Sequence, residues 1–211
     1  MSFATTSRLQ IRAVEPSDAP TWLRIRSQYS VLLSTTLGYV VPPGPNTWEH
    51  EKKWIEGALF AGLVEVKPEF VHLRRMLHDE EQGALEPSRE EQEKHAEWER
   101  QRRAVGFLTL TVPPKNRDAV LGIMLGAEWH ALGFGTELLQ WVVPYAFEQL
   151  GMHRLSLDVV GSNTTAMRLY EKVGFKEEGR KNAAIWENGG WVDLVFMAIL
   201  EEEYWAERQR Q

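Results

Sequence analysis

One stretch, residues 121–139, restricts the fold of this chain more than any other. It begins with the apolar run 121–125, passes through a short polar break, reaches the glycines Gly133 and Gly135, and ends in an apolar helical pattern. Glycine allows close approach to the backbone, and the start of the following helix presents unpaired N–H groups and a partial positive charge. The stretch therefore predicts a strand, a turn and a helix, with a phosphate-binding site at the turn.

Two other phosphate-binding motifs fit this turn less well. A dinucleotide-binding fingerprint needs a third glycine at position 138, where the chain has Leu138, and its first glycine should follow the strand directly. A P-loop needs Gly-Lys followed by Ser or Thr, which the chain lacks. Asp158 does lie at about the distance expected of a ribose-binding acid. A dinucleotide-dependent oxidoreductase and a glycine turn without a ligand therefore stay open at this point.

Composition excludes several classes of protein. The 211 residues, 43% of them apolar, suffice for one domain over residues 1–211, and the net charge of −6 is unlike that of nucleic-acid-binding proteins. The chain has no cysteine for a disulfide, a thiolate metal site or a nucleophile, and its six histidines lack metal-binding spacing. It shows no secretory signal and no run of the roughly 18 apolar residues that a membrane helix needs. We expect a soluble cytoplasmic monomer or homodimer with no metal and no nucleic-acid or membrane partner.

The pattern of apolar residues predicts an α/β protein. Strands are expected at 8–14, 70–74, 105–112, 119–125, 154–160, 181–187 and 191–200. Helices are expected around 22–26, 47–59, 164–173, and from just after Gly135 to Leu150. Pro144 should kink or split the last of these, and Asn188-Gly189-Gly190 should form a hairpin turn.

The segment 77–103 differs from the rest of the chain in its charge. Between Ser88 and Arg103 only Ala96 and Trp98 are apolar. A helix there has almost no face to bury, although Ser88-Arg89-Glu90-Glu91 has the pattern of a capping box. We expect a charged, solvated insertion within the single domain.

A second motif follows the glycine turn at the spacing of one helix, and together the two resemble a known family. His130-Ala131-Leu132-Gly133-Phe134-Gly135 is similar to the acetyl-CoA signature of the GCN5-related N-acetyltransferase (GNAT) superfamily. Asn163, Ala166 and the run Leu169–Phe175 (LYEKVGF) are similar to its strand–helix motif. The resemblance is strong over 105–175 and looser to residue 200. Its pattern is most similar to the ribosomal-protein alanine acetyltransferase-like branch.

The resemblance implies a fold, a co-substrate and a set of contacts. The fold is a mixed, mostly antiparallel sheet of about six to seven strands flanked by helices, with strands that splay at an acetyl-CoA site. The backbone from Leu132 to Thr136 would hold the pyrophosphate, and the strand residues before it would hold the pantetheine arm. His130 stands where the family has Gln or Arg. The implied cofactor-binding residues are Ile123, Met124, Leu125, His130, Leu132, Gly133, Phe134, Gly135, Thr136, Asn163, Ala166, Tyr170 and Lys172.

The implied activity is transfer of an acetyl group from acetyl-CoA to a primary amine, on a small molecule or a peptide N-terminus. Tyr170 would protonate the departing thiolate, because a phenol of pKa about 10 is protonated at neutral pH. Without cysteine there is no thiolate to form an acetyl-enzyme, so the amine would attack directly in a ternary complex. The base is not identified; Asp158, Asp193 and Glu65 are candidates. A non-catalytic acyl-CoA-binding module is the alternative.

Overall fold

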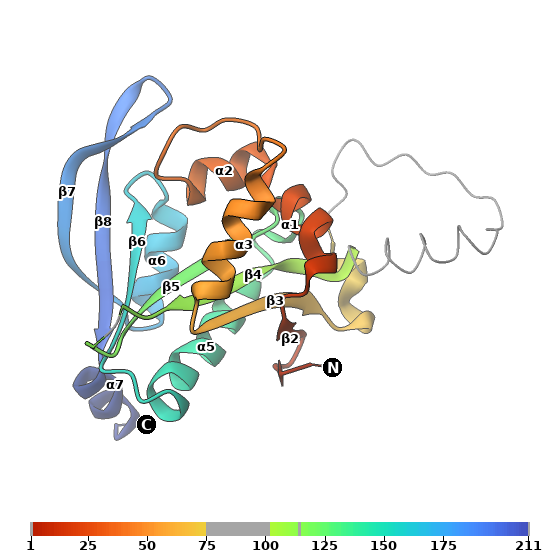
Figure 1. Cartoon of the computed structure of the whole chain (residues 1–211). Coiled ribbons are helices and arrows are strands. Elements are labelled where there is room, and N and C mark those ends of the chain that lie inside the picture. The colour runs from red at the N-terminus through yellow and green to blue at the C-terminus, as the bar shows by residue number, and fades with distance from the viewer. Residues whose placement is uncertain (1, 75–101, 114, 211) are drawn as a thin grey trace.

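A single mixed sheet organises the part of the chain that the computed structural model describes, residues 2–74, 102–113 and 115–210. Its eight strands lie in the order β1-β2-β3-β4-β5-β6-β8-β7 (Figure 1). They are β1 (Ala4–Thr5), β2 (Leu9–Ala13), β3 (Phe60–Val66), β4 (Ala104–Thr111), β5 (Asp118–Leu125), β6 (Arg154–Val160), β7 (Lys176–Glu187) and β8 (Gly190–Leu200). The expected fold class is confirmed. The sheet exceeds the expected six or seven strands because the two-residue β1 adds an edge.

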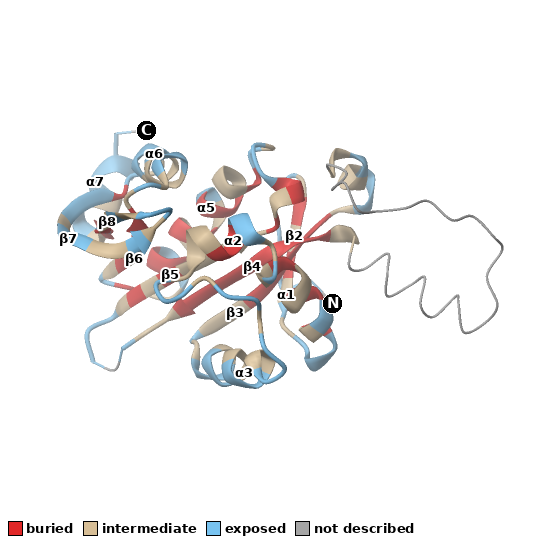
Figure 2. Ribbon diagram, turned by 90° about the horizontal axis from the view of Figure 1, so that it is seen from above, coloured by how far each residue is buried: buried red, intermediate tan, exposed pale blue. Residues whose placement is uncertain are grey.

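Helices cover both faces of the sheet (Figures 1 and 2). One face carries α1 (Ala19–Arg26) and α3 (Thr47–Gly57), and the opposite face carries α5 (Phe134–Pro144) and α6 (Thr164–Lys172). We call these the α1–α3 face and the α5–α6 face. The helix α2 (Tyr29–Thr35) packs with α1 and lies beside β5 and β6. Short helical turns and a C-terminal helix complete the fold: η1 (Pro16–Asp18), η2 (Pro68–Leu73), η3 (Ala127–Trp129), η4 (Tyr145–Gln149) and α7 (Glu201–Arg208).

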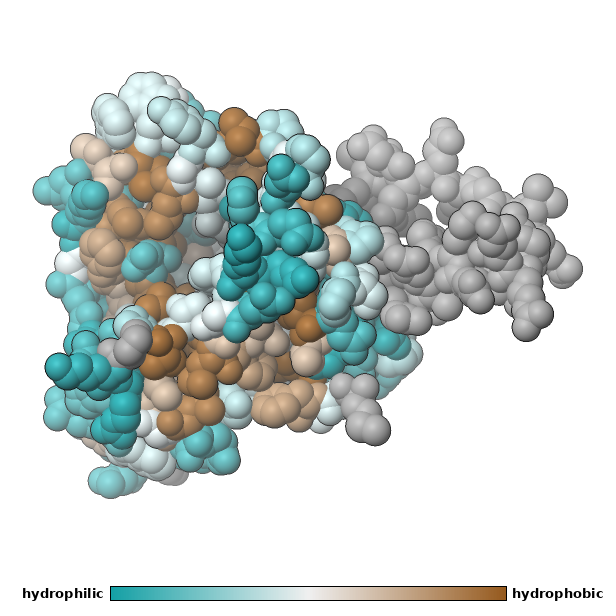
Figure 3. Space-filling view, viewed as in Figure 1, coloured by the Kyte–Doolittle hydropathy of each residue, from teal (hydrophilic) through white to brown (hydrophobic). Residues whose placement is uncertain are grey.

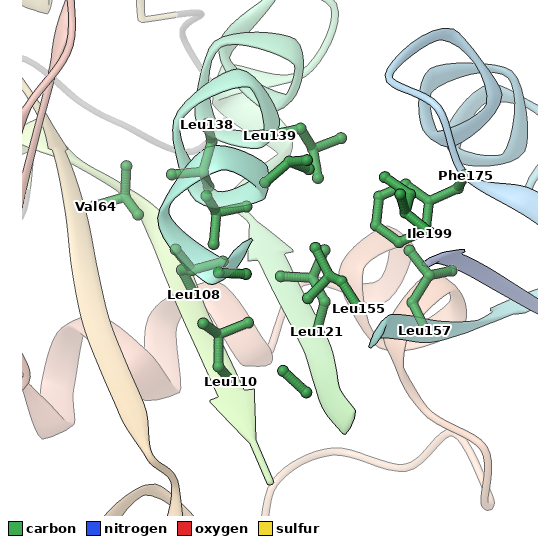
Figure 4. Packing of buried hydrophobic residues seen from close by; sticks show 14 of the residues in the cluster. Val64, Leu108, Leu110, Leu121, Leu138, Leu139, Leu155, Leu157, Phe175 and Ile199 are labelled. Atoms are coloured by element: carbon green, nitrogen blue, oxygen red, sulfur yellow. The ribbon is translucent and has the colours of Figure 1, made fainter. Parts of the chain in front are cut away.

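The main core lies between the sheet and α5. Leu138, Leu139 and Val142 of α5 are fully buried against the strands, as Figure 4 shows for the two leucines. Each such side chain contributes about 1.5–3 kcal/mol by leaving water. Leu155 and Leu157 of β6 point into the same cluster. Since successive strand residues point to opposite faces, Ser156 and Asp158 lie on the α1–α3 face.

The helix that follows the glycine turn is split at its proline, as predicted. The α-helical part ends at Pro144, and the chain continues through one wider turn over Tyr145–Gln149, closed by Leu150 N donating to Tyr145 O at 3.1 Å. Proline lacks the N–H that would continue the helical ladder, which explains why the helix changes at this residue. The predicted Asn188–Gly189 hairpin turn is also confirmed, with φ values of 47° and 84°.

One predicted strand is wrong. Residues 70–74 were expected as a strand, but Pro68–Leu73 forms the 3₁₀ turn η2. Pro68 sits at the start of this turn, where its fixed φ favours a helical conformation. The strand of this region is instead Phe60–Val66, buried along most of its length. It reads as a nearly continuous apolar run because both of its faces are covered, so it lacks the alternation that marks a half-buried strand.

Two other expectations concern the charged segment and the membrane. Most of the predicted insertion 77–103 lies outside the described residues, so it stays a prediction. Within the described ranges, no helix is both long enough and apolar enough to span a bilayer.

Candidate functional site: a split between two strands

The sheet opens between β5 and β6, which form the only parallel pair among the described strands. These strands pair only through Asp118–Val120 and Arg154–Ser156. Beyond Val120, the described part of β5 pairs with β4 alone, so Ile123, Met124 and Leu125 face an open edge on the β6 side. This is the splay that the resemblance implied. It leaves backbone groups of β5 available to an extended ligand.

The glycine turn lies at the end of this split. Gly133 adopts φ 81°, a conformation that side chains other than glycine rarely take, and it is exposed at the cap of α5. The first N–H groups of this eleven-residue helix have no partner within the helix, and no side chain of the described residues caps them. Thr136 is half-buried behind the turn, and Phe134 is buried in the core. The turn thus presents backbone N–H groups and the positive helix end to a bound anion.

Gly135 is constrained from the other side. A Cβ at this position would lie 3.0 Å from Cδ2 of Leu169 on α6 and 3.6 Å from Cδ1 of Leu125. The glycine pair therefore serves two purposes: Gly133 supplies the turn, and Gly135 lets α6 pack against the start of α5. The two motifs that carried the family resemblance are in direct contact at this point.

The structure gives two more of the expected cofactor residues a hydrogen-bond partner. His130 is exposed, and its Nε2 lies 3.0 Å from the carbonyl oxygen of Leu125, at the end of the open edge of β5. The Oδ1 of Asn163 accepts a hydrogen bond from Ala166 N at 3.1 Å and so caps α6. This capping role was one of two expected for Asn163, and among the described residues its Nδ2 has no hydrogen-bond partner. Lys172 is exposed at the end of α6.

Tyr170 lies on α6 and packs against the main core, with its ring 5.7 Å from that of Phe175. The residue as a whole is half-buried, and desolvation by the surrounding protein raises the pKa of its phenol to about 12. Tyr170 therefore keeps its proton across the neutral range.

The three acids named as possible bases differ in what surrounds them. Glu65 is buried on β3, where it accepts from Gln10 Nε2 at 2.7 Å and lies 3.6 Å from Arg12 Nε. Asp193 accepts from the backbone N–H of Ala183 at 3.0 Å, at the bulge of β7. Both carboxylates are held by structural partners.

Asp158 is the exception. Within the described residues it forms no hydrogen bond or ion pair, and it lies on β6 just past the end of the pairing with β5. It is exposed to solvent, yet nearby protein raises the pKa of its carboxyl by desolvation. Figure 3 shows this face of the molecule hollowed between the hydrophilic surface of α3 and an apolar surface over β6 and β8. Phe196, the residue paired with Asp158 on β8, is 38% exposed there.

A buried carboxylate just before the glycine turn was missed by the sequence reasoning. Glu128 is fully buried and forms an ion pair with Arg24 of α1; Arg74 Nη2 lies 3.7 Å from it. Gln28 donates to Glu128 Oε2 at 2.8 Å and accepts from the N–H of Ala127 at 2.7 Å. Burial favours the protonated form, but the bonds from Arg24 and Gln28 outweigh it and lower the pKa of Glu128. This cluster ties α1 and α2 to the loop that leads into the turn.

Comparison with known proteins agrees with this geometry. The family model of the acetyltransferase (GNAT) domain matches residues 8–176. The chain belongs to the GNAT acetyltransferase family. The family assignment expected from the two motifs is thus confirmed.

Relatives of this GNAT chain share its central region. It is 40% identical over 89 residues to a probable N-acetyltransferase of Bacillus subtilis, YjcK. The aligned region covers 41% of this chain and 48% of YjcK. It is 34% identical over 89 residues to spermidine N(1)-acetyltransferase of Vibrio cholerae, covering 42% of this chain and 51% of the relative. These matches thus span about half the length of each curated relative.

A solved structure covers more of the chain. Spermidine N-acetyltransferase from Vibrio cholerae, in complex with CoA and spermine, matches with a TM-score of 0.69 over 94% of this chain and 99% of that one. The identity is 22%, so this likeness supports the fold alone. Among the described residues of this GNAT chain, no three His, Cys, Asp or Glu side chains are grouped as a metal site.

Proposed function

We propose that this protein transfers the acetyl group of acetyl-CoA to a primary amine. The observation that carries the proposal is the split between β5 and β6, which ends at the glycine turn and the start of α5. A turn with an exposed glycine and unpaired N–H groups fits the pyrophosphate of CoA, and the open edge of β5 fits its extended pantetheine arm. Family membership and the names of the relatives support the same reaction.

Acetyl-CoA supplies the acetyl group as a thioester, and this chain supplies the two proton transfers. The substrate arrives as an ammonium ion. Asp158 takes one of its protons, and the neutral nitrogen then forms a bond to the carbonyl carbon. As the carbon–sulfur bond breaks, Tyr170 gives its phenolic proton to the thiolate. The nitrogen releases its second proton to water, from which Tyr170 regains one, and Asp158 later releases its proton to solvent. A phenol held in its protonated form can act as this acid.

Asp158 suits the role of base better than Glu65 or Asp193, because no cation or backbone N–H among the described residues stabilises its carboxylate. A raised pKa makes it a stronger proton acceptor than an ordinary aspartate. It also lies on the α1–α3 face, whereas Tyr170 packs on the α5–α6 face. The amine would thus arrive on one side of the split, and the thiolate would be protonated on the other.

The experiment is an acetyl-transfer assay with acetyl-CoA and a panel of polyamines, amino acids, and peptides with free N-termini. We expect at least one amine to be acetylated, and Tyr170→Phe to lower kcat by about 10²-fold or more with little change in the affinity for CoA. Tyr204→Phe is the matched control. Tyr204 lies on α7, where its hydroxyl donates a hydrogen bond to Glu148 of η4, outside the proposed site. Tight CoA binding without transfer to any amine would favour the non-catalytic alternative.

A further inference from the structure

The N-terminal strand pair places a cation against the glycine turn. Arg8, in the turn between β1 and β2, donates through Nη1 to the carbonyl oxygen of Leu132 at 3.0 Å. Its guanidinium carbon lies 4.5 Å from the centre of the Phe134 ring. A Cβ built on Gly133 would come within 3.3 Å of Arg8 Nη2. Arg8 therefore contacts Leu132 and Phe134 and lies beside Gly133, which stands between them in the turn.

A carboxylate of α5 orients this arginine. Glu137 Oε2 accepts from Arg8 Nε at 2.7 Å. Its other oxygen, Oε1, accepts from Thr6 Oγ1 at 2.5 Å, from Ser7 Oγ at 3.0 Å and from Arg8 N at 2.7 Å. The acid is thus held by four donors from one short segment. Arg8 cannot turn away from the helix start without breaking one of these bonds.

Part of the guanidinium remains unused. It has five N–H donors. In the described part of the chain, Nε bonds Glu137 and Nη1 bonds Leu132, while Nη2 has no hydrogen-bond partner. The side chain is 29% exposed. Two N–H donors with a positive charge therefore lie beside Gly133, at the proposed pyrophosphate site.

Charge gives a reason for this arrangement. Glu137 lies in the first turn of α5, where its negative charge partly offsets the positive charge of the helix end. The same negative charge would repel a bound diphosphate. A guanidinium in contact with both the acid and the turn cancels that repulsion. It also adds a donor of the kind that binds phosphate oxygens well.

We propose that Arg8 is a ligand of the CoA phosphates, acting with the backbone N–H groups of the turn. The proposal rests on the proposed CoA site and adds to it a residue from the opposite end of the sheet. It implies that recognition of the phosphate group is shared between the N-terminal segment and α5.

The test compares acetyl-CoA with acetyl-pantetheine, which has the same thioester and arm but no phosphate. Arg8→Met should weaken the binding of acetyl-CoA about ten-fold or more and leave that of acetyl-pantetheine unchanged. Arg8→Lys should fall between, because it keeps the charge and loses the fork of donors. Arg210→Met is the control for removal of a surface cation, since that side chain is 76% exposed on the C-terminal segment.

The outcomes separate three cases. A loss for acetyl-CoA alone supports the phosphate contact. An equal loss for both thioesters means that Arg8 only shapes the turn, and no loss for either means that it has no part in binding; each overturns the proposal. Failure of the unmodified protein to bind either thioester would instead contradict the proposed CoA site itself.

The fold should survive these substitutions, which keeps the test informative. Arg8→Met leaves Glu137 with three of its four donors, the two hydroxyls and the backbone N–H. Thermal unfolding of each variant, measured without ligand, identifies any loss of binding that comes from loss of structure.

Discussion

Ser156 Oγ donates a hydrogen bond to Asp118 Oδ1 at 2.7 Å, from the last paired row of β5 and β6 back to the first. The bond joins the two strands on the α1–α3 face immediately before they separate. It also fixes one carboxylate of this face in a structural role. Asp158 lies two residues beyond Ser156 on the same face and is the next acid of β6 along the split. It has no such partner among the described residues.

Asp158 should govern the acidic limb of the pH profile. Desolvation raises its pKa, so the carboxylate that accepts the proton forms at a higher pH than it would in a fully solvated aspartate. We expect kcat/KM to rise with pH through this raised pKa. Tyr170, with a pKa of about 12, should add no falling limb below about pH 11.

Asp158→Asn should therefore lower kcat by about 10²-fold or more and abolish that limb. Desolvation disfavours the ionised carboxylate in the folded protein. The free energy of unfolding therefore falls as pH rises through the folded pKa of Asp158. The variant should thus be at least as stable as the parent at neutral pH, measured by urea unfolding. Asp118→Asn is the control, because its amide can still accept from Ser156. An unchanged pH profile in Asp158→Asn would assign the base elsewhere.

Gly133→Ala should weaken CoA binding. The substitution places a Cβ at φ 81°, which costs about 1–2 kcal/mol, and the turn would relieve this strain by moving its N–H groups. Gly151→Ala imposes comparable strain at φ 60° in open space at the other end of the helical segment. Both variants should lose stability in denaturant unfolding, and Gly133→Ala should lose slightly more because its Cβ would also lie 3.3 Å from Arg8 Nη2. In isothermal titration only Gly133→Ala should lose affinity for CoA.

Local sequence patterns predicted the structure correctly where the backbone conformation depends on a single residue type. The strand–turn–helix at the glycines, the split at Pro144 and the hairpin at Asn188 each depend on one residue's permitted φ or missing N–H. These follow from sequence alone. The split between β5 and β6 was predicted only from the family resemblance, because no single residue in either strand encodes it.

The remaining features depend on contacts between distant segments. Arg8 and Glu137 are 129 positions apart, and Arg24 and Glu128 are 104 apart. Nothing in the local spacing marks either partner, since a charged residue in a strand or in the first turn of a helix is common at the surface. The strand Phe60–Val66 was missed for a related reason: its burial on both faces comes from helices elsewhere in the chain.

Asn163 can be tested for its two roles separately. Asn163→Asp keeps a side-chain oxygen for the N–H of Ala166 and so should retain the cap of α6. It loses the Nδ2 donor, so we expect the KM for acetyl-CoA to rise while the melting temperature stays within about a degree or two. Asn163→Ala should lose both, with about 1 kcal/mol of stability. Equal KM values for Asn163→Asp and the parent would limit this residue to capping.

The buried Glu128 cluster should make the free energy of unfolding depend on pH. The pKa of Glu128 is lowered in the folded protein, because bonds from Arg24 and Gln28 outweigh the effect of its burial. A lowered folded pKa means that the stabilising interaction is complete above the unfolded pKa of a glutamate and is lost as pH falls through the folded value. The parent should therefore lose stability steadily below about pH 4.5.

Glu128→Gln should remove this dependence and lower stability at neutral pH by roughly 3–5 kcal/mol, because it breaks the buried ion pairs of Glu128 with Arg24 and Arg74. Glu178→Gln, which breaks a more exposed pair with Arg154, should change stability by less than about 1 kcal/mol. Urea unfolding at pH 7 and pH 4 measures both. The loop bonded by Gln28 leads directly into the glycine turn, so a weakened Glu128 cluster should also loosen the cofactor site. We expect Glu128→Gln to raise the KM for acetyl-CoA more than Glu178→Gln does.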